Sequence, residues 1–380
     1  MALSLTQKQA RRTFLGILVG GTLLLAGCQT APGGPRPGSL PGPATPQAVP
    51  QNGVAVIVPL TGGDAAVGQS IANAAKLALD DTGEKSLKIT VYDSAGAGGA
   101  AAAATRAIAD GNRLILGPLL SEDVRAAAPI ARQVGVPVIS FSNDRDVAGN
   151  GVFIMGFTPD QSISRVVAYA KSRGLTRYAA LAPSGVYGQR ATQSALGAVR
   201  RTGGVMGAVE TYDRSATSVG AAARRLNAKG GYDAVLIADG GRIAAVAAPA
   251  LRVGPRLLGT ELWATDKMLG KTIALRGGWY AAAPDAQFDK LTVRYRARYG
   301  KAPFRLASLG YDAVLLAVRS ARDWNIGRPF PAKRLIEADG FGGVDGSFRF
   351  GRDGIADRLL EVRQVTATGS DVIDPAKTAF

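Results

Sequence analysis

Short runs of consecutive apolar residues alternate with longer alanine-rich stretches through most of the chain. This alternation restricts the fold more than any other feature of the sequence. Residues 54–60 (VAVIVPL) are apolar almost without interruption, as expected of a strand buried on both faces of a parallel sheet. Ile71, Ala74 and Ala78 then recur at helical spacing. Repetition of this unit predicts an α/β protein built on doubly wound parallel sheets.

The alternation occurs in two successive blocks, which predicts two α/β lobes. The strands expected in the first block are residues 54–60, 87–93, 113–117, 136–142 and 152–157. Those of the second block are residues 178–183, 205–213, 233–238 and 256–260. Two helices (286–299 and 306–324) and two short strands (346–350 and 359–366) are expected to follow. The nearly identical segments 232–238 and 311–317 are predicted to be a strand and a helix, respectively, because their flanking residues differ.

The N-terminus has the pattern of an exported lipoprotein. Residues 1–27 combine a basic start with an apolar run that is short for a membrane span, and they end directly before Cys28. The sequence LLAGC resembles a bacterial lipobox, which predicts a signal peptide over 1–27 and acylation of Cys28. Residues 10–16 (ARRTFLG) resemble a twin-arginine export signal, and the general secretory route stays open. By resemblance to Gram-negative sorting rules, Gln29 favours the outer membrane.

Residues 28–52 are predicted to carry the lipidated cysteine and a tether rich in proline and glycine. The prolines stand at positions 32, 35, 37, 41, 43, 46 and 50. Such a segment buries little apolar area and prefers extended, polyproline-like conformations. At about 3.1 Å per residue it could hold a domain up to roughly 75 Å from a membrane. The acyl chains would then be the membrane anchor.

The chain is basic, with a formal net charge of +16. Removal of residues 1–27, which contain three basic residues and no acidic ones, would leave +13. A basic surface suits anionic neighbours such as lipid headgroups or cell-wall polymer, but it also follows from the Ala, Gly and Arg richness of a GC-rich genome. The basic residues are scattered, without a stripe of interleaved aromatic residues, so no nucleic-acid partner is expected.

Familiar catalytic patterns do not occur in this sequence. It contains no histidine and one cysteine, which excludes Ser-His and Cys-His catalysis and most zinc sites. Neither G-x-S-x-G nor a serine followed three residues later by lysine is present. Residues 96–101 (GAGGAA) fit a dinucleotide fingerprint, but the next strand does not end in the required acid. Residues 270–272 (GKT) lack the first glycine of a P-loop, because Thr265 stands there. No enzyme activity, cofactor or metal is therefore expected.

Polar side chains follow several of the predicted strands, where ligands of open α/β sheets bind. Ser121 begins a helix, and either a helix cap or a ligand clamp explains it. Hydroxyl and N–H groups suit an anion, and acids suit an ammonium group, so together they would fit an amino-acid-like zwitterion. The alternative is that they are ordinary polar residues facing water. The candidate ligand-binding residues are Ser121, Ser142, Asp144, Tyr187, Asp239 and Glu261.

Residues 53–380 resemble the type I periplasmic binding proteins of the leucine/isoleucine/valine-binding kind. The motifs that carry this resemblance are VYDSAG, LILGPLLSEDVRAAAPIARQVGVPVISFSND, VYGQ and YDAVLL. In that family a serine of a G-P-x-x-S loop, the loop after the next strand, a tyrosine and an acid of the second lobe hold the amino acid. The resemblance thus implies contacts from Ser121, Ser142 with Asp144, Tyr187 and Glu261.

The same resemblance implies that the chain crosses three times between two lobes. The crossings are expected near residues 157–160, 282–286 and 341–346. The first lobe would then contain residues 53–157 plus 285–342, and the second lobe residues 158–284 plus 343–380.

Three further segments are similar to lipoproteins known as penicillin-binding protein activators. They are residues 237–241 (IADGG), 257–263 (LLGTELW) and 340–350 (GFGGVDGSFRF). This likeness implies a non-enzymatic outer-membrane lipoprotein that faces the periplasm and regulates a peptidoglycan synthase. Better-known members carry a helical-repeat domain before the binding module, where this chain has only the tether. The alternative function is substrate capture for an amino-acid ABC importer.

Overall fold

The computed structural model describes residues 50–266 and 268–380. The predicted signal peptide, the acylation site at Cys28 and nearly all of the predicted tether lie outside the described residues. None of the helices in the described part of the chain is long and apolar enough to cross a membrane.

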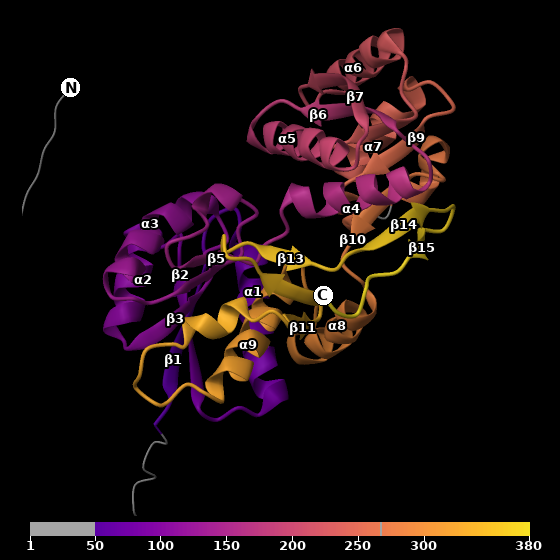
Figure 1. Ribbon diagram of the computed structural model, residues 1–380. Coiled ribbons are helices and arrows are strands. Elements are labelled where there is room, and N and C mark those ends of the chain that lie inside the picture. Colours follow the sequence, from indigo (N-terminus) through magenta and orange to yellow (C-terminus); the bar gives the residue numbers. More distant parts are fainter. Residues whose placement is uncertain (1–49, 267) are drawn as a thin grey trace, which may run out of the picture. The chain divides into compact units, whose positions relative to one another are not determined.

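The first lobe is a five-stranded parallel sheet with helices on both faces (Figure 1). Its strands, in the spatial order β2-β1-β3-β4-β5, are β1 (Asn52–Val58), β2 (Leu87–Asp93), β3 (Asn112–Leu116), β4 (Val138–Ser140) and β5 (Val152–Ile154). The connecting helices are α1 (Ala65–Thr82), α2 (Gly99–Ala109) and α3 (Ser121–Gln133). Val54 and Val56 pack on the side of α1, whereas Ala55 and Ile57 pack on the side of α2 and α3. Burial on both faces explains the uninterrupted apolar run of β1.

The second lobe repeats this plan. Its five parallel strands follow the spatial order β10-β9-β8-β6-β7, the counterpart of the first sheet. They are β6 (Arg177–Pro183), β7 (Val205–Tyr212), β8 (Ala234–Ile237), β9 (Arg256–Gly259) and β10 (Trp279–Ala282). The covering helices are α4 (Pro159–Ser172), α5 (Val186–Arg201), α6 (Ala216–Lys229) and α7 (Gly241–Ala247). The antiparallel strands β14 (Glu361–Val365) and β15 (Ser370–Asp374) extend the sheet beyond β10. The predicted α/β class with two doubly wound lobes is confirmed.

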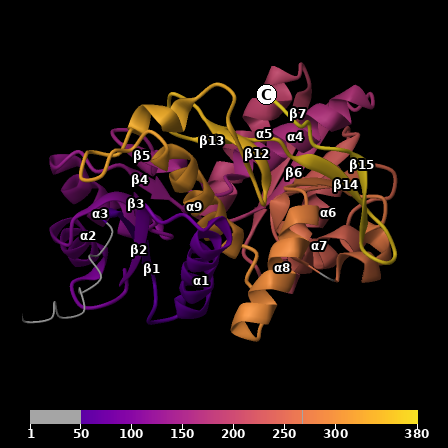
Figure 2. The same ribbon diagram turned by 90° about the horizontal axis from the view of Figure 1, so that it is seen from below.

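After β10 the chain returns to the first lobe as α8 (Ala286–Tyr299) and α9 (Ala307–Ala321), and α9 lies beside α1 (Figure 2). Gly310 permits this approach, because an added Cβ would stand 2.4 Å from the carbonyl oxygen of Ile71. The Tyr311 hydroxyl donates to Asp81 of α1 at 2.8 Å. The described part of the chain also contains six short 3₁₀ helices: η1 (Arg145–Val147), η2 (Ala248–Ala250), η3 (Glu261–Thr265), η4 (Leu269–Lys271), η5 (Ile273–Leu275) and η6 (Ala332–Ile336).

A small antiparallel sheet of β11 (Phe341–Gly343), β12 (Gly346–Phe350) and β13 (Ala356–Arg358) follows. Phe348 and Phe350 are buried in the core of the first lobe, and the ring of Phe350 meets Phe153 of β5 edge-on at 5.3 Å. The expectation that the second lobe begins again at residue 343 is therefore wrong for residues 343–358. The two aromatic side chains bury their area against β5, so the third crossing follows Arg358.

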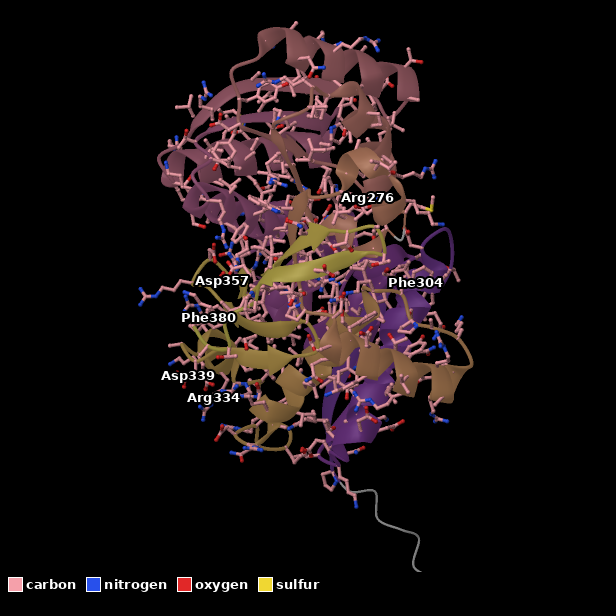
Figure 3. All side chains as sticks on the ribbon, turned by 90° about the vertical axis from the view of Figure 1, so that its right-hand side faces the viewer. Arg276, Phe304, Arg334, Asp339, Asp357 and Phe380 are labelled. Atoms are coloured by element: carbon pink, nitrogen blue, oxygen red, sulfur yellow. The ribbon has the colours of Figure 1, made fainter. Side chains whose placement is uncertain are left out.

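The core position of this small sheet predicts a large effect of Phe348→Ala. Phe348 is 1% exposed, and its loss should lower the free energy of unfolding by about 3–5 kcal/mol. Urea unfolding of the purified protein measures this change. Phe304→Ala is the matched control, because Phe304, labelled in Figure 3, lies between α8 and α9 and is 49% exposed. Equal stability of the two variants would contradict the assignment of the small sheet to this core.

Candidate ligand-binding cleft

A cavity of about 460 Å³ lies between the two lobes, at the carboxyl ends of both parallel sheets. Most of its wall is apolar, with side chains that include Val67, Leu119, Leu120, Phe141, Leu262 and Leu306. The polar residues that line it are Asp64, Asn143, Glu261, Thr265 and Arg305. An apolar cavity with a few polar groups at the ends of parallel strands is typical of small-molecule sites.

The sharp turn after β3 brings Leu119 and Leu120 to this cavity. Gly117 has a φ of +99°, which side chains with a Cβ rarely adopt. An added Cβ would also stand 2.0 Å from the carbonyl oxygen of Ile57 in β1. Glycine is therefore required where the chain leaves the sheet, and it lets the loop pass closely over β1.

Glu261, the first residue of η3, lines the cavity from the second lobe. It is partly exposed, and the Ser162 hydroxyl of α4 donates to its carboxylate. Burial raises the pKa of Glu261 to about 7, although the hydrogen bond from Ser162 acts in the opposite direction. Of the six residues predicted from sequence to bind a ligand, Glu261 is the one that the structure places on the cavity wall.

Tyr187, at the start of α5, lies close to Glu261 without lining the cavity. Its hydroxyl donates to the Thr260 hydroxyl at 3.3 Å, directly before Glu261 in the chain. Burial, together with the charge of Glu261, raises the pKa of Tyr187 above its ordinary value. The phenol therefore stays neutral and supports the loop that holds Glu261.

Ser121 does not cap its helix. It is the first residue of α3, Leu120 occupies the cap position, and the cap makes no side-chain hydrogen bond. The nearest partner of the Ser121 hydroxyl is the Glu122 carboxylate at 3.5 Å. The interpretation as a cap is wrong, because the helix begins at Ser121 itself, one residue earlier than a capping serine requires. Among the described residues, those that line the cavity include Leu119 and Leu120 but not Ser121.

Ser142 and Asp144 lie in the turn after β4, and Asp144 forms an ion bridge with two arginines. The Ser142 hydroxyl accepts a hydrogen bond from the Asp144 backbone at 3.1 Å. The carboxylate of Asp144 is 2.7 Å from Arg125 of α3 and 2.7 Å from Arg190 of α5. Since α3 belongs to the first lobe and α5 to the second, Asp144 links the lobes. Its two oxygens are thereby occupied, and neither Ser142 nor Asp144 lines the cavity.

Asp239, two residues after β8, is also buried, and its oxygens accept hydrogen bonds from neighbouring side chains. Arg214 donates to its carboxylate at 2.9 Å, and the Tyr212 hydroxyl donates at 3.3 Å. Its carbonyl oxygen accepts from the Trp263 indole at 3.1 Å. Asp239 therefore positions neighbouring loops of the second lobe and does not belong to the cavity wall.

Arg305 lines the cavity and was not expected from the sequence. It precedes α9 and reaches the cleft because the chain returns to the first lobe after β10. No motif or periodicity distinguishes it from the other arginines. Asn143 was also missed, although it stands between the predicted residues Ser142 and Asp144 at the end of a predicted strand, and this position is the signal that could have found it.

The chain belongs to the periplasmic binding protein family, whose family model matches residues 53–370. A putative branched-chain amino acid ABC transporter protein from Rhodospirillum rubrum has the same fold, with a TM-score of 0.73 and 24% identity over 85% of this chain and 100% of that one. An ABC transporter substrate-binding protein from Desulfitobacterium hafniense, solved in complex with Leu, matches with a TM-score of 0.65 and 20% identity over 85% of this chain and 100% of that one.

A curated relative, an uncharacterized protein of Rickettsia prowazekii, is 25% identical over 174 residues. That alignment covers 46% of this chain and 47% of the relative, so it spans about half of either protein. Family and fold together define a binding protein of periplasmic type.

The ion bridge predicts a stability that depends on pH. Burial alone would raise the pKa of Asp144, but hydrogen bonds from the Asp146 backbone, Arg125 and Arg190 lower it below its ordinary value. The bridge therefore stabilises the protein fully above the unfolded-state pKa of about 3.9, and this contribution is lost as the pH falls through the lower folded-state value. Asp144→Asn should lower the free energy of unfolding by about 1–3 kcal/mol at pH 7.

Urea unfolding of both proteins between pH 7 and pH 3 measures the difference, which should shrink as the wild-type carboxylate becomes protonated. Asp146→Asn is the control, since the Asp146 side chain is 72% exposed and pairs with Arg190 at 3.2 Å. Its effect should stay below about 1 kcal/mol. A difference between wild type and Asp144→Asn that is independent of pH would refute the charged bridge.

Proposed function

We propose that this protein captures a small molecule with an apolar body and an amino-acid-like head group, and that it delivers this ligand to an ABC importer. The observation that carries the proposal is the apolar cavity between the lobes with Glu261 on its wall. Substrate-binding proteins with the same fold, one of them in complex with Leu, support this choice.

The size and lining of the cavity fit such a ligand. Small-molecule sites commonly measure about 300–1,000 Å³, and about 460 Å³ lies in the lower part of that range. The leucine and phenylalanine side chains of the wall would cover an aliphatic or aromatic body, with a gain of about 0.8 kcal/mol per buried CH₂ group. A strongly polar ligand such as a sugar would place most of its hydroxyl groups against apolar side chains of this wall, which costs free energy.

We propose that the carboxylate of Glu261 binds the ammonium group of the ligand. It reaches the cavity from the second lobe, while most of the apolar side chains come from the first. The ligand contacts of Ser121, Ser142, Asp144, Tyr187 and Asp239 that the sequence suggested stay predictions. The observed hydrogen bonds of Ser142, Asp144, Tyr187 and Asp239 favour a role in holding the loops of the cleft.

Regulation of a peptidoglycan synthase is the other role predicted from the sequence. In this structure, segments that suggested this role form strands and bury aromatic side chains in the core. Residues 257–263 contain most of β9, Glu261 and the buried Trp263. Residues 340–350 contain β11 and β12, whose aromatic residues lie in the first-lobe core. The synthase role therefore stays a prediction, and ligand capture is the better-supported proposal.

The proposed location is the periplasm, with the chain held at a membrane through acylated Cys28. Outer-membrane sorting stays a prediction from Gln29. We expect Cys28→Ser to move the protein from the membrane fraction to the soluble periplasmic fraction, because the acyl chains are the proposed anchor. Fractionation followed by immunoblotting measures this, and a variant that stays in the membrane fraction would contradict the anchor. Gln29→Asp serves as the control that keeps the cysteine.

Ligand capture predicts a thermal stabilisation of the purified protein by apolar amino acids. A ligand at about 100 times its Kd adds roughly 2.7 kcal/mol, which corresponds to several degrees in lobes of this size. A thermal-shift screen with leucine, isoleucine, valine, phenylalanine and their deaminated acids tests this, with glucose and peptidoglycan fragments as controls. Stabilisation by none of the apolar compounds would overturn the proposal. Ser121→Ala, examined with the best ligand, tests the contact that the family resemblance implies.

The raised pKa of Glu261 predicts how the affinity depends on pH. A ligand ammonium prefers the ionised carboxylate, which is populated increasingly as the pH rises through about 7. The affinity for an amino acid should therefore increase by up to about tenfold per pH unit below pH 7 and level off above it. Calorimetric titrations at pH 6, 7 and 8 measure this, and Glu261→Gln should abolish the dependence. The same slope in both proteins would exclude Glu261 as the ammonium site.

A further inference from the structure

Arg305 is the cationic side chain among the described residues that line the cavity. It comes from the first lobe, in the loop between α8 and α9, whereas Glu261 comes from the second lobe. Its side chain is 20% exposed. The apolar wall therefore carries one fixed cation in addition to its carboxylates, and a ligand that fills the cavity meets both kinds of charge.

The guanidinium of Arg305 is held in place by hydrogen bonds and by an aromatic ring. Its Nη1 atom donates to the fully buried carboxylate of Asp345 and, at 3.1 Å, to the Ser308 hydroxyl. Its Cζ atom lies 4.2 Å from the ring centroid of Phe288. The Nε and Nη2 atoms donate to none of the described residues and are not enclosed by protein. An oriented guanidinium with two free donors is suited to bind a carboxylate through a pair of hydrogen bonds.

The charge of Asp345 also acts on a second arginine, Arg358. Arg358, at the end of β13, is 5% exposed and donates through Nη2 to the Met155 carbonyl at 2.6 Å. Its Nε and Nη1 atoms are buried without a partner in the described structure, as is Oδ2 of Asp345. A second acid, Asp312, is buried beside them, and burial followed by the charge of Asp345 raises its pKa to about 7.

Two arginines thus lie near two buried acidic side chains, Asp345 and Asp312, and the pKa of Asp312 is raised to about 7. Charges in such buried surroundings of low dielectric constant act strongly on a nearby anion. Arg305 is the member of this cluster that lines the cavity, so it is the one placed to contact a ligand directly.

We infer that Arg305 binds the carboxylate of the ligand, so that the cleft selects apolar carboxylic acids and requires the carboxylate more than the amino group. This inference rests on the proposed function and specifies its substrate class. A ligand held by Arg305 and Glu261 together would connect the first lobe to the second. A ligand without an amino group would keep the Arg305 contact and lose the Glu261 contact.

Calorimetry with three related probes tests this inference. The probes are leucine, 4-methylpentanoate, which lacks the amino group, and 3-methylbutylamine, which lacks the carboxylate. The full-length wild-type protein should bind leucine and 4-methylpentanoate, and it should bind 3-methylbutylamine at least tenfold more weakly. Arg305→Gln should weaken leucine and 4-methylpentanoate binding at least tenfold and leave the amine unchanged.

Arg319→Gln is the matched control, because Arg319 also belongs to the first lobe and pairs with an acid, Glu337, at 3.2 Å. It should bind all probes as the wild type does. If Arg305→Gln fails to fold, Arg305→Lys keeps the charge and removes the paired donors, and it should still weaken binding of both carboxylates several-fold.

Two outcomes separate this inference from the proposed function. Wild-type affinity for leucine in the Arg305 variants would overturn the role of Arg305 and leave ligand capture intact, as would equal binding of the amine and the carboxylates by the wild type. If the wild type bound neither leucine nor 4-methylpentanoate, and no apolar acid in the thermal screen, both proposals would fail.

Discussion

The burial of parallel strands on both faces is the constraint on which the rest of the structure depends. In β1, Val54 and Val56 pack toward one layer of helices, and Ala55 and Ile57 pack toward the other. With both faces covered, polar groups can gather only where the strands end. Because the second lobe follows the same plan, the carboxyl ends of two sheets border one cavity. The location of the candidate site is thus a consequence of how the sheets are covered.

The polar residues beside this cavity divide into two kinds. Ser142, Asp144 and Asp239 have their side-chain oxygens engaged by backbone, arginine or tyrosine donors, and they hold the loops and link the lobes. Glu261 and Arg305 instead present groups to the cavity. The distinction follows from hydrogen bonding: a buried carboxylate with two charged partners has no free oxygen for a ligand, whereas a carboxylate with one hydroxyl partner still has one.

The opposite charges of Glu261 and Arg305 on a mostly apolar wall restrict the ligand more than the volume does. An apolar body gains from burial against leucine and phenylalanine side chains, while an uncompensated charge in the same place would cost free energy. Glu261, with its pKa near 7, carries its charge most readily when a cation is present. The hydrogen bond from Arg305 to Asp345 holds the guanidinium in a fixed orientation. A carboxylate with an apolar tail can pair with Arg305 and bury its tail against the apolar wall. An added ammonium group can also pair with Glu261.

The sequence by itself determined the α/β class, the two lobes and most of the strands, because those features depend on apolar runs and helical spacing between near neighbours. It also separated the strand that contains 234–237 from the helix that contains 311–317 despite their similar sequences, since the flanking residues differ. Of the candidate site, it predicted Glu261 at a strand end. Only the tertiary structure placed Arg305 in the cleft, joined Asp144 to Arg190, and packed Phe348 and Phe350 into the first lobe. Contacts between residues far apart in the chain leave no periodic signal, so they are decided only when the elements pack together.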